Sequence, residues 1–145
     1  MKYQTLEQLQ KVAEVHAGQA QPAAMTRSER LQRWADLLDQ NPDRQLGTFA
    51  GTEYQPAGTR QTMRSAGSAI TVAFDDAAFR AEGLENDTYG EAKRFFDLTD
   101  WQLHDIVCYC HFGETMRAHA AARRVRAAVN GQFNLFSRLR DAILG

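Results

Sequence analysis

The sequence predicts an all-α fold, a single compact domain over residues 1–145 with six or seven mainly short helices. One long irregular connection is expected around residues 43–67. Three observations lead to this prediction. Capping patterns recur in front of segments with helical spacing of apolar residues. No two segments make a convincing pair of strands. The composition, 43% hydrophobic and 24% charged, is ordinary for a globular domain.

Length and charge narrow the class of protein. A chain of 145 residues can bury a hydrophobic core without support from disulfide bonds or structural metals, and two cysteines do not make a disulfide framework. A net charge of −1 provides no overall attraction to nucleic acid or to an anionic membrane. The segment MKYQTLEQLQKVAEVH contains no continuous apolar run, so we expect neither a signal peptide nor a membrane anchor. We therefore expect a cytoplasmic protein with reduced thiols.

Two helices are predicted in the first third of the chain. The first covers Thr5 to Ala17, where Thr5 and Gln8 match a capping box. The second begins near Thr26, which forms the same pattern with Glu29. Asn41-Pro42 ends it, because proline disfavours helical geometry in the residue before it.

The middle of the chain is less regular. Residues 43–67 contain four glycines and one proline and have no sustained apolar period. A loop of this length is unusual in a compact domain unless it is functional or mobile. Residues 68–74, SAITVAF, have the β-branched content of a strand but lack a pairing partner, so we expect a short helical turn.

Several short helices follow. Asp75 or Asp76 is predicted to cap one that ends at Gly83, and Asp87 to cap the next. Thr99 and Gln102 form a third capping box, opening a helix that ends at Gly113.

An alanine- and arginine-rich helix is then expected from Thr115 to Val129, and a last one carries Phe133, Phe136, Leu139 and Ile143 along one side. The alanines suggest close helix packing, either within the domain or between two copies. The acids of residues 75–105 and the arginines of residues 117–140 form lobes of opposite charge, which we expect to satisfy each other.

Both cysteines and two histidines lie in residues 104–113, HDIVCYCHFG. On a helix, Cys110 falls on the apolar stripe with Leu103, Ile106 and Val107, so it is predicted to be core. His104, Cys108 and His111 instead follow each other at spacings of four and three, in a row beside that stripe.

Three kinds of site are compatible with this row. Two imidazoles and a thiolate suit zinc or another transition metal, or haem, with His119, His16 or an acid as a fourth ligand. Cys108 as a nucleophile would need a lowered pKa, and its place deep in a helix disfavours one. A purely structural row is the third interpretation, and we prefer it because Cys-x-Cys-His is not a standard zinc spacing.

Other patterns give no specific activity. The arginines of residues 117–126 spread around their helix instead of forming one stripe, which disfavours a nucleic-acid surface. The acidic run of residues 75–91 does not match a calcium loop. The aromatic residues, Trp34 and Trp101 among them, are expected in the core.

The sequence therefore predicts a small helical protein with no cofactor, most simply a non-enzymatic interaction or regulatory module. Its partner would be another protein or a second copy, with no membrane and no nucleic acid. The first alternative is a metal- or haem-binding protein that uses His104, Cys108 and His111, with His119 as a possible fourth ligand. The second is a small-molecule-binding domain, in which residues 43–67 close over a pocket walled by the His104 row.

Overall fold

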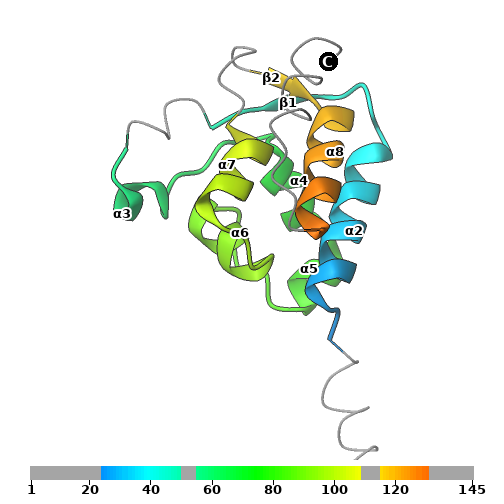
Figure 1. The fold of residues 1–145 in the computed structure, drawn as a ribbon, viewed down its shortest axis with the longest axis horizontal. Helices are drawn as coiled ribbons and strands as arrows, with labels where there is room; N and C mark the ends of the chain where they lie inside the picture. Colours follow the sequence, from blue (N-terminus) through cyan, green and yellow to red (C-terminus); the bar gives the residue numbers. More distant parts are fainter. Residues whose placement is uncertain (1–23, 50–54, 109–114, 131–145) are drawn as a thin grey trace, which may run out of the picture.

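The computed structural model describes residues 24–49, 55–108 and 115–130. Within these ranges the chain is mostly helical, with seven helices and one two-stranded sheet (Figure 1), so the predicted all-α class is confirmed. The elements are α2 (Arg27–Asp39), β1 (Gln45–Gly47), α3 (Ala57–Arg60), α4 (Ala69–Phe74), α5 (Ala77–Ala81), α6 (Tyr89–Phe95), α7 (Asp100–Val107), β2 (Thr115–Arg117) and α8 (Ala118–Val129). The helices predicted over residues 5–17 and around residues 133–143 lie outside the described ranges, as does Cys110.

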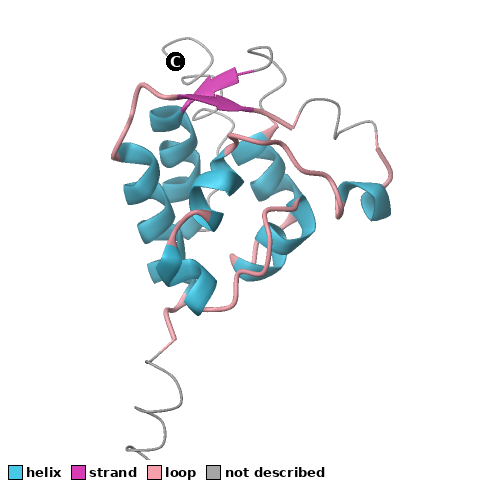
Figure 2. Cartoon of the chain, turned by 180° about the vertical axis from the view of Figure 1, so that it is seen from behind, coloured by secondary structure: helices cyan, strands magenta, loops and turns pink. Residues whose placement is uncertain are grey.

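The elements are arranged around one core. α2 and α8 lie side by side, α6 and α7 lie opposite them, and α4 and α5 close the space between the two pairs (Figures 1 and 2). The two strands run across one end of this helical core, while α3 lies to one side of it, in the connection between β1 and α4 (Figure 1). None of the helices in the described ranges has both the length and the apolar character needed to cross a membrane.

Side-chain caps fix three helix starts at the residues that the sequence predicts. Thr26 and Thr99 each form a complete capping box, and Asp76 accepts a hydrogen bond from the Phe79 backbone N–H at the start of α5. Segment 68–74 forms α4, capped by Ser68, as the absence of a pairing strand suggests. The prediction of Asp87 as a cap is wrong. Thr88 caps α6, and Asp87 forms an ion pair with Arg64.

The small sheet was not predicted. β1 and β2 pair antiparallel with Leu46 opposite Met116, so α8 begins at Ala118 and not at the predicted Thr115. No side chain caps this start. The N–H groups of Ala118 and His119 donate instead to the Arg44 and Pro42 carbonyls, each at 2.9 Å. Backbone groups distant in sequence satisfy this helix end, which explains why no local capping pattern marks it.

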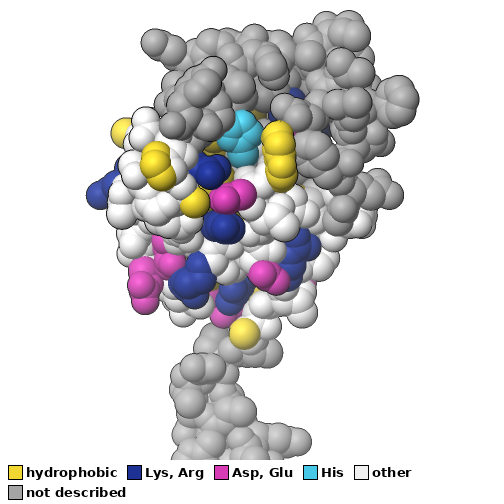
Figure 3. Space-filling model, turned by 60° about the vertical axis from the view of Figure 1, so that its left-hand side comes forward, with side chains coloured by type: hydrophobic (Ala, Val, Ile, Leu, Met, Phe, Trp, Pro, Cys, Tyr) yellow, Lys and Arg dark blue, Asp and Glu magenta, His cyan; other side chains and the backbone are white. Residues whose placement is uncertain are grey.

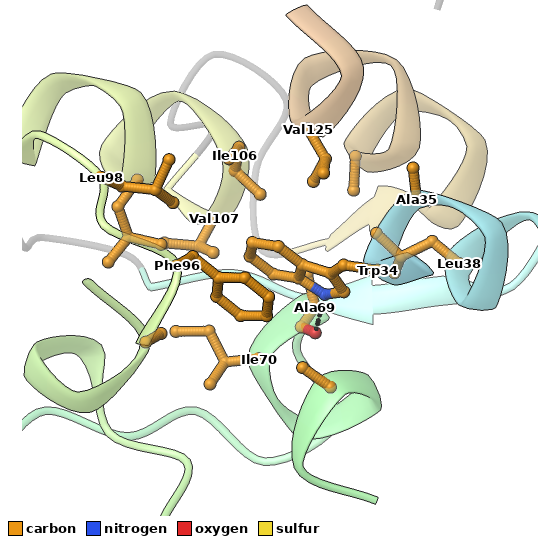
Figure 4. Close-up of a cluster of buried hydrophobic side chains, with 14 of the residues drawn as sticks. Trp34, Ala35, Leu38, Ala69, Ile70, Phe96, Leu98, Ile106, Val107 and Val125 are labelled. Atoms are coloured by element: carbon orange, nitrogen blue, oxygen red, sulfur yellow. Dashed lines mark hydrogen bonds between the residues drawn. The ribbon is translucent and has the colours of Figure 1, made fainter. Parts of the chain in front are cut away.

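The centre of the core is an aromatic stack. Trp34 of α2 lies parallel to Phe96 at a ring separation of 4.2 Å, and its indole N–H donates to the Ala69 carbonyl at 2.9 Å (Figure 4). Phe79 and Phe95 contact the Phe96 ring edge-on. This hydrogen bond ties α2 to α4, while the stack ties α2 to the end of α6.

The alanine-rich helix packs inside the domain. Ala118, Ala121, Ala122 and Val125 are buried, and α8 lies directly against α2. Small side chains allow two helices to approach closely, so among the described residues the alanines serve internal packing.

One arginine of α8 departs from the predicted surface role. Arg124 is only 4% exposed and donates to the Asp105 carboxylate at 2.9 Å and to the Asp105 carbonyl at 2.8 Å. This pair joins α8 to α7.

Within the described ranges, the predicted pairing of the two charged lobes is seen between Arg124 and Asp105. The other acids of residues 75–105 that form ion pairs within the described ranges do so with bases of residues 30–94, as in Arg33–Asp76 and Arg30–Glu82. Arg126 pairs with Asp36 and Asp39 of α2. In the described part of the chain, these ion pairs therefore mostly join neighbouring helices and do not link the two lobes.

Candidate functional site

A pocket of about 540 Å³ opens between α3 and the first two turns of α7. Its lining comprises Arg60, Asp100, Trp101 and His104. Figure 3 shows a histidine side chain set back in a hollow, next to hydrophobic side chains and above a group of basic and acidic ones. The volume is within the range of small-molecule sites.

The start of α7 places three of the four lining residues that lie in the described ranges. The Thr99 capping box fixes the first turn, so that Asp100, Trp101 and His104 follow on its outer side. The inner side of α7, with Leu103, Ile106 and Val107, is fully buried. The helix is therefore anchored through its core face and presents a fixed set of polar and aromatic groups to the pocket.

Trp101 is the unusual member of this set. It is 61% exposed and is the only exposed large hydrophobic residue within the described ranges, in contrast to the core position predicted for it. Its ring lies at 86° to the His104 ring with 5.9 Å between centroids. At about 100° per residue, Trp101 falls about 160° from Leu103 on the helix, so the wheel already indicates an outward position.

Arg60 reaches the pocket because its segment is docked onto α6. Backbone N–H groups of Tyr89 and Gly90 donate to the carbonyls of Met63 and Gln61, each at 2.9 Å. Gly90 permits this approach, since a Cβ there would stand 2.8 Å from the Gln61 carbonyl oxygen. Two main-chain hydrogen bonds thus fix the segment that follows α3 and hold Arg60 opposite α7.

The charges at the pocket are unequal. The Asp100 carboxylate is 3.9 Å from the Arg60 guanidinium and 3.4 Å from the Lys93 ammonium, so two cations share one anion. The Arg60 contact is an ion pair too long for a hydrogen bond. Within the described part of the chain, the buried Arg60 Nε has no hydrogen-bond partner. Two bases therefore lie beside one acid at the edge of this pocket, and one guanidinium N–H of Arg60 has no partner among the described residues.

Tyr89, the first residue of α6, is fully buried and contacts the start of α7. Its hydroxyl donates to the Asp100 carbonyl at 3.1 Å. Burial raises the pKa of the Tyr89 hydroxyl well above its usual range, and nearby Cys108 and Asp100 raise it further, whereas Arg60 opposes the shift. A neutral phenol at this position stabilises the start of α7 and is poorly suited to act as a base.

Two members of the predicted metal row have different surroundings. His104 lines the pocket, whereas Cys108 is fully buried beyond the last turn of α7. The helix ends at Val107 and does not continue to the predicted Gly113, and the Phe49 backbone N–H donates to the Val107 carbonyl at 2.9 Å. That contact covers the helix end, which explains why Cys108 is core although the wheel places it beside the apolar stripe.

The other predicted ligands lie elsewhere. His119 is on α8, where Nδ1 is 2.9 Å from Asp39 and Nε2 accepts a hydrogen bond from Arg123 at 3.3 Å. Ligation through His119 would require breaking one of these contacts. His111 and His16 lie outside the described residues. Residues 24–49, 55–108 and 115–130 contain no group of three or more histidines, cysteines or acids arranged to hold a metal ion. The metal site stays a prediction.

Comparison with known proteins adds no family. Neither the models of protein families, nor the curated proteins, nor the solved structures gave a match to this chain. The pocket is therefore interpreted from its own chemistry.

Proposed function

We propose that the protein is a non-enzymatic binding domain that holds a small molecule in the pocket between α3 and α7. The exposure of Trp101 beside a polar pocket supports this proposal most directly. A tryptophan can bury a large apolar area when a ligand covers it, at about 25 cal/mol per Å². His104, Arg60 and Asp100 supply the few polar groups that orient a ligand in such sites.

The geometry favours binding over acid–base catalysis. Asp100 is neutralised by two cations, and Tyr89 holds its proton firmly. The Tyr89 hydroxyl therefore lacks the pKa near neutrality that a general acid or base needs.

A small ligand also suits the surface better than a second copy of the chain. A stable protein interface buries about 800 Å² on each partner around an apolar centre. Within the described ranges, Trp101 is the single large hydrophobic residue that is exposed, and it borders a concave site. One aromatic side chain at a hollow is the arrangement expected for a ligand of limited size.

The two tryptophans of the chain provide a test by nuclear magnetic resonance. We would record the two indole N–H signals while adding small aromatic and aliphatic compounds of positive, negative and zero charge. At least one compound should shift the Trp101 signal saturably and leave the signal of buried Trp34 unchanged. Substitution Trp101→Phe identifies the signal. Failure of every compound to shift the Trp101 signal, up to its solubility limit, would refute the proposed function.

A further inference from the structure

Given the proposed function, we infer that the ligand class of this pocket is an anion that carries a flat aromatic ring, of which an aromatic carboxylate is the simplest example. The anionic group would lie on Arg60, and the ring on Trp101. The inference rests on the proposed function and extends it from a pocket to a chemical class.

The charge balance argues for an anion. Arg60 and Lys93 share the single carboxylate of Asp100, at 3.9 and 3.4 Å, so one positive charge is left over. The Arg60 side chain is 20% exposed, and its Nε has no hydrogen-bond partner among the described residues. A guanidinium with an unused donor in a partly desolvated site is matched by a carboxylate, which accepts two parallel hydrogen bonds.

The placement of the aromatic groups argues for a flat ring. Trp101 meets His104 nearly at right angles, so the indole and imidazole form two walls of a corner at the pocket. A planar ring can lie against one wall and meet the other with its edge, and both arrangements are favourable for aromatic pairs. An aliphatic ligand of the same charge would lose this contribution.

A cation is the opposite possibility, since Trp101 could hold one against its ring face. The local charges disfavour it. Asp100 is already engaged with two bases, and a ligand cation would be placed near Arg60 and Lys93. Like charges at this range repel in a partly buried site.

Four simple compounds separate these contributions. Benzoate carries both features, benzamide lacks the charge, cyclohexanecarboxylate lacks the aromatic ring, and benzylamine reverses the charge. Each would be titrated into the full chain while the Trp101 indole signal is followed. We expect benzoate to bind with a Kd on the order of millimolar, as its size dictates. The other three should bind at least about fivefold more weakly, because each loses one of the two contributions.

Three variants assign the anion to Arg60. Arg60→Gln should weaken benzoate binding about tenfold or more, because a charge-assisted hydrogen bond is lost. Arg64→Gln is the matched control: Arg64 lies four residues on, is largely exposed and pairs with Asp87, so its loss should change the Kd less than twofold. Asp100→Asn should strengthen benzoate binding about threefold or more, since the competing carboxylate is removed. A misfolded variant cannot produce a gain in affinity, which keeps this test decisive.

The outcomes distinguish failure of the inferred ligand class from failure of the proposed function. Tighter binding of benzamide, cyclohexanecarboxylate or benzylamine than of benzoate would overturn the inferred class and leave the pocket as a binding site. Weaker benzoate binding in Asp100→Asn, or unchanged binding in Arg60→Gln, would also overturn it. If neither these four compounds nor any other tested compound shifts the Trp101 signal saturably, the proposed function itself is refuted.

Discussion

The two tryptophans show how position decides the role of one residue type. Trp34 is fully buried, hydrogen-bonded to Ala69 and stacked on Phe96, whereas Trp101 is mostly exposed at the pocket. The same indole therefore packs in the core in one place and, under the proposed function, contacts a ligand in the other.

Substitution Trp34→Phe should lower the free energy of unfolding by about 2–3 kcal/mol, because it leaves a small cavity and removes the indole hydrogen bond to the Ala69 carbonyl. Trp101→Phe should change it by less than about 0.5 kcal/mol. Urea unfolding followed by circular dichroism measures both. Equal losses in the two variants would contradict the core position of Trp34.

Asp76 gives a pH-dependent prediction at the residue scale. Its hydrogen bond with Arg33, at 2.8 Å, lowers the pKa of the Asp76 carboxyl against the opposing effect of burial. Because the pKa is lower in the folded state, the stabilisation is complete above the pKa of an unfolded aspartate, about 4. It is lost as the pH falls through the folded-state pKa.

Asp76→Asn keeps an N-cap residue for α5 and removes only the charge. At pH 7 we expect a loss of about 0.5–1 kcal/mol, small because Arg33 is 42% exposed. The difference from the unsubstituted protein should shrink below pH 4. The control Asp75→Asn removes an exposed neighbouring charge. Unfolding curves at pH 7 and pH 3 that show a constant difference for Asp76→Asn would rule out the ion-pair explanation.

At the scale of elements, the docking of α3 and its following turn onto α6 decides the shape of the pocket. Gly90→Ala would push a methyl group against the carbonyl and side chain of Gln61. We expect a loss of about 1–3 kcal/mol, as for other overpacked sites, and weaker binding at the pocket.

Gly58→Ala in α3 is the matched control, because a Cβ at Gly58 meets nothing within 4 Å. It should raise stability by about 0.4–1 kcal/mol by restricting the unfolded chain. Thermal unfolding and benzoate titration of both variants test the assignment. A harmless Gly90→Ala substitution would show that the two segments are not in close contact.

Local signals in the sequence predict the helices and fail for long-range contacts. Capping residues such as Thr26 and Thr99 act within four residues, so they can be recognised from the local sequence. The sheet depends on backbone pairing across some seventy residues and leaves no such pattern. Among the pocket residues, His104 was singled out from sequence. Arg60 was not, because only the docking of a distant segment brings it opposite Asp100.

At the scale of the whole molecule, Cys108 can distinguish the proposed binding pocket from the predicted metal site, because it belongs to the predicted metal row and is not among the described lining residues of the pocket. Cys108 is fully buried. The substitution Cys108→Ser should therefore lower the free energy of unfolding by about 1–2 kcal/mol, since a hydroxyl replaces an apolar thiol. It should leave benzoate affinity within twofold. Benzoate binding that is abolished while the fold is retained would place the thiol in the ligand site.

The metal prediction is tested on the same variant. The protein would be purified without a metal-affinity tag and subjected to elemental analysis with an absorption spectrum. The metal hypothesis requires near-stoichiometric zinc or iron that disappears in Cys108→Ser. Metal content that is the same in both proteins would end that hypothesis for the row of His104, Cys108 and His111.

The pairing of α2 with α8 has a consequence for the protein while it is being made. α2 is complete about eighty residues before α8 begins to leave the ribosome. At about 5–20 residues per second, the apolar side of α2 therefore waits roughly 4–16 s for its partner helix. During that interval the nascent chain offers Leu31, Ala35 and Leu38 to any other hydrophobic surface, including a chaperone. Slowing translation between the two helices should therefore lower the yield of folded protein more than slowing it after α8.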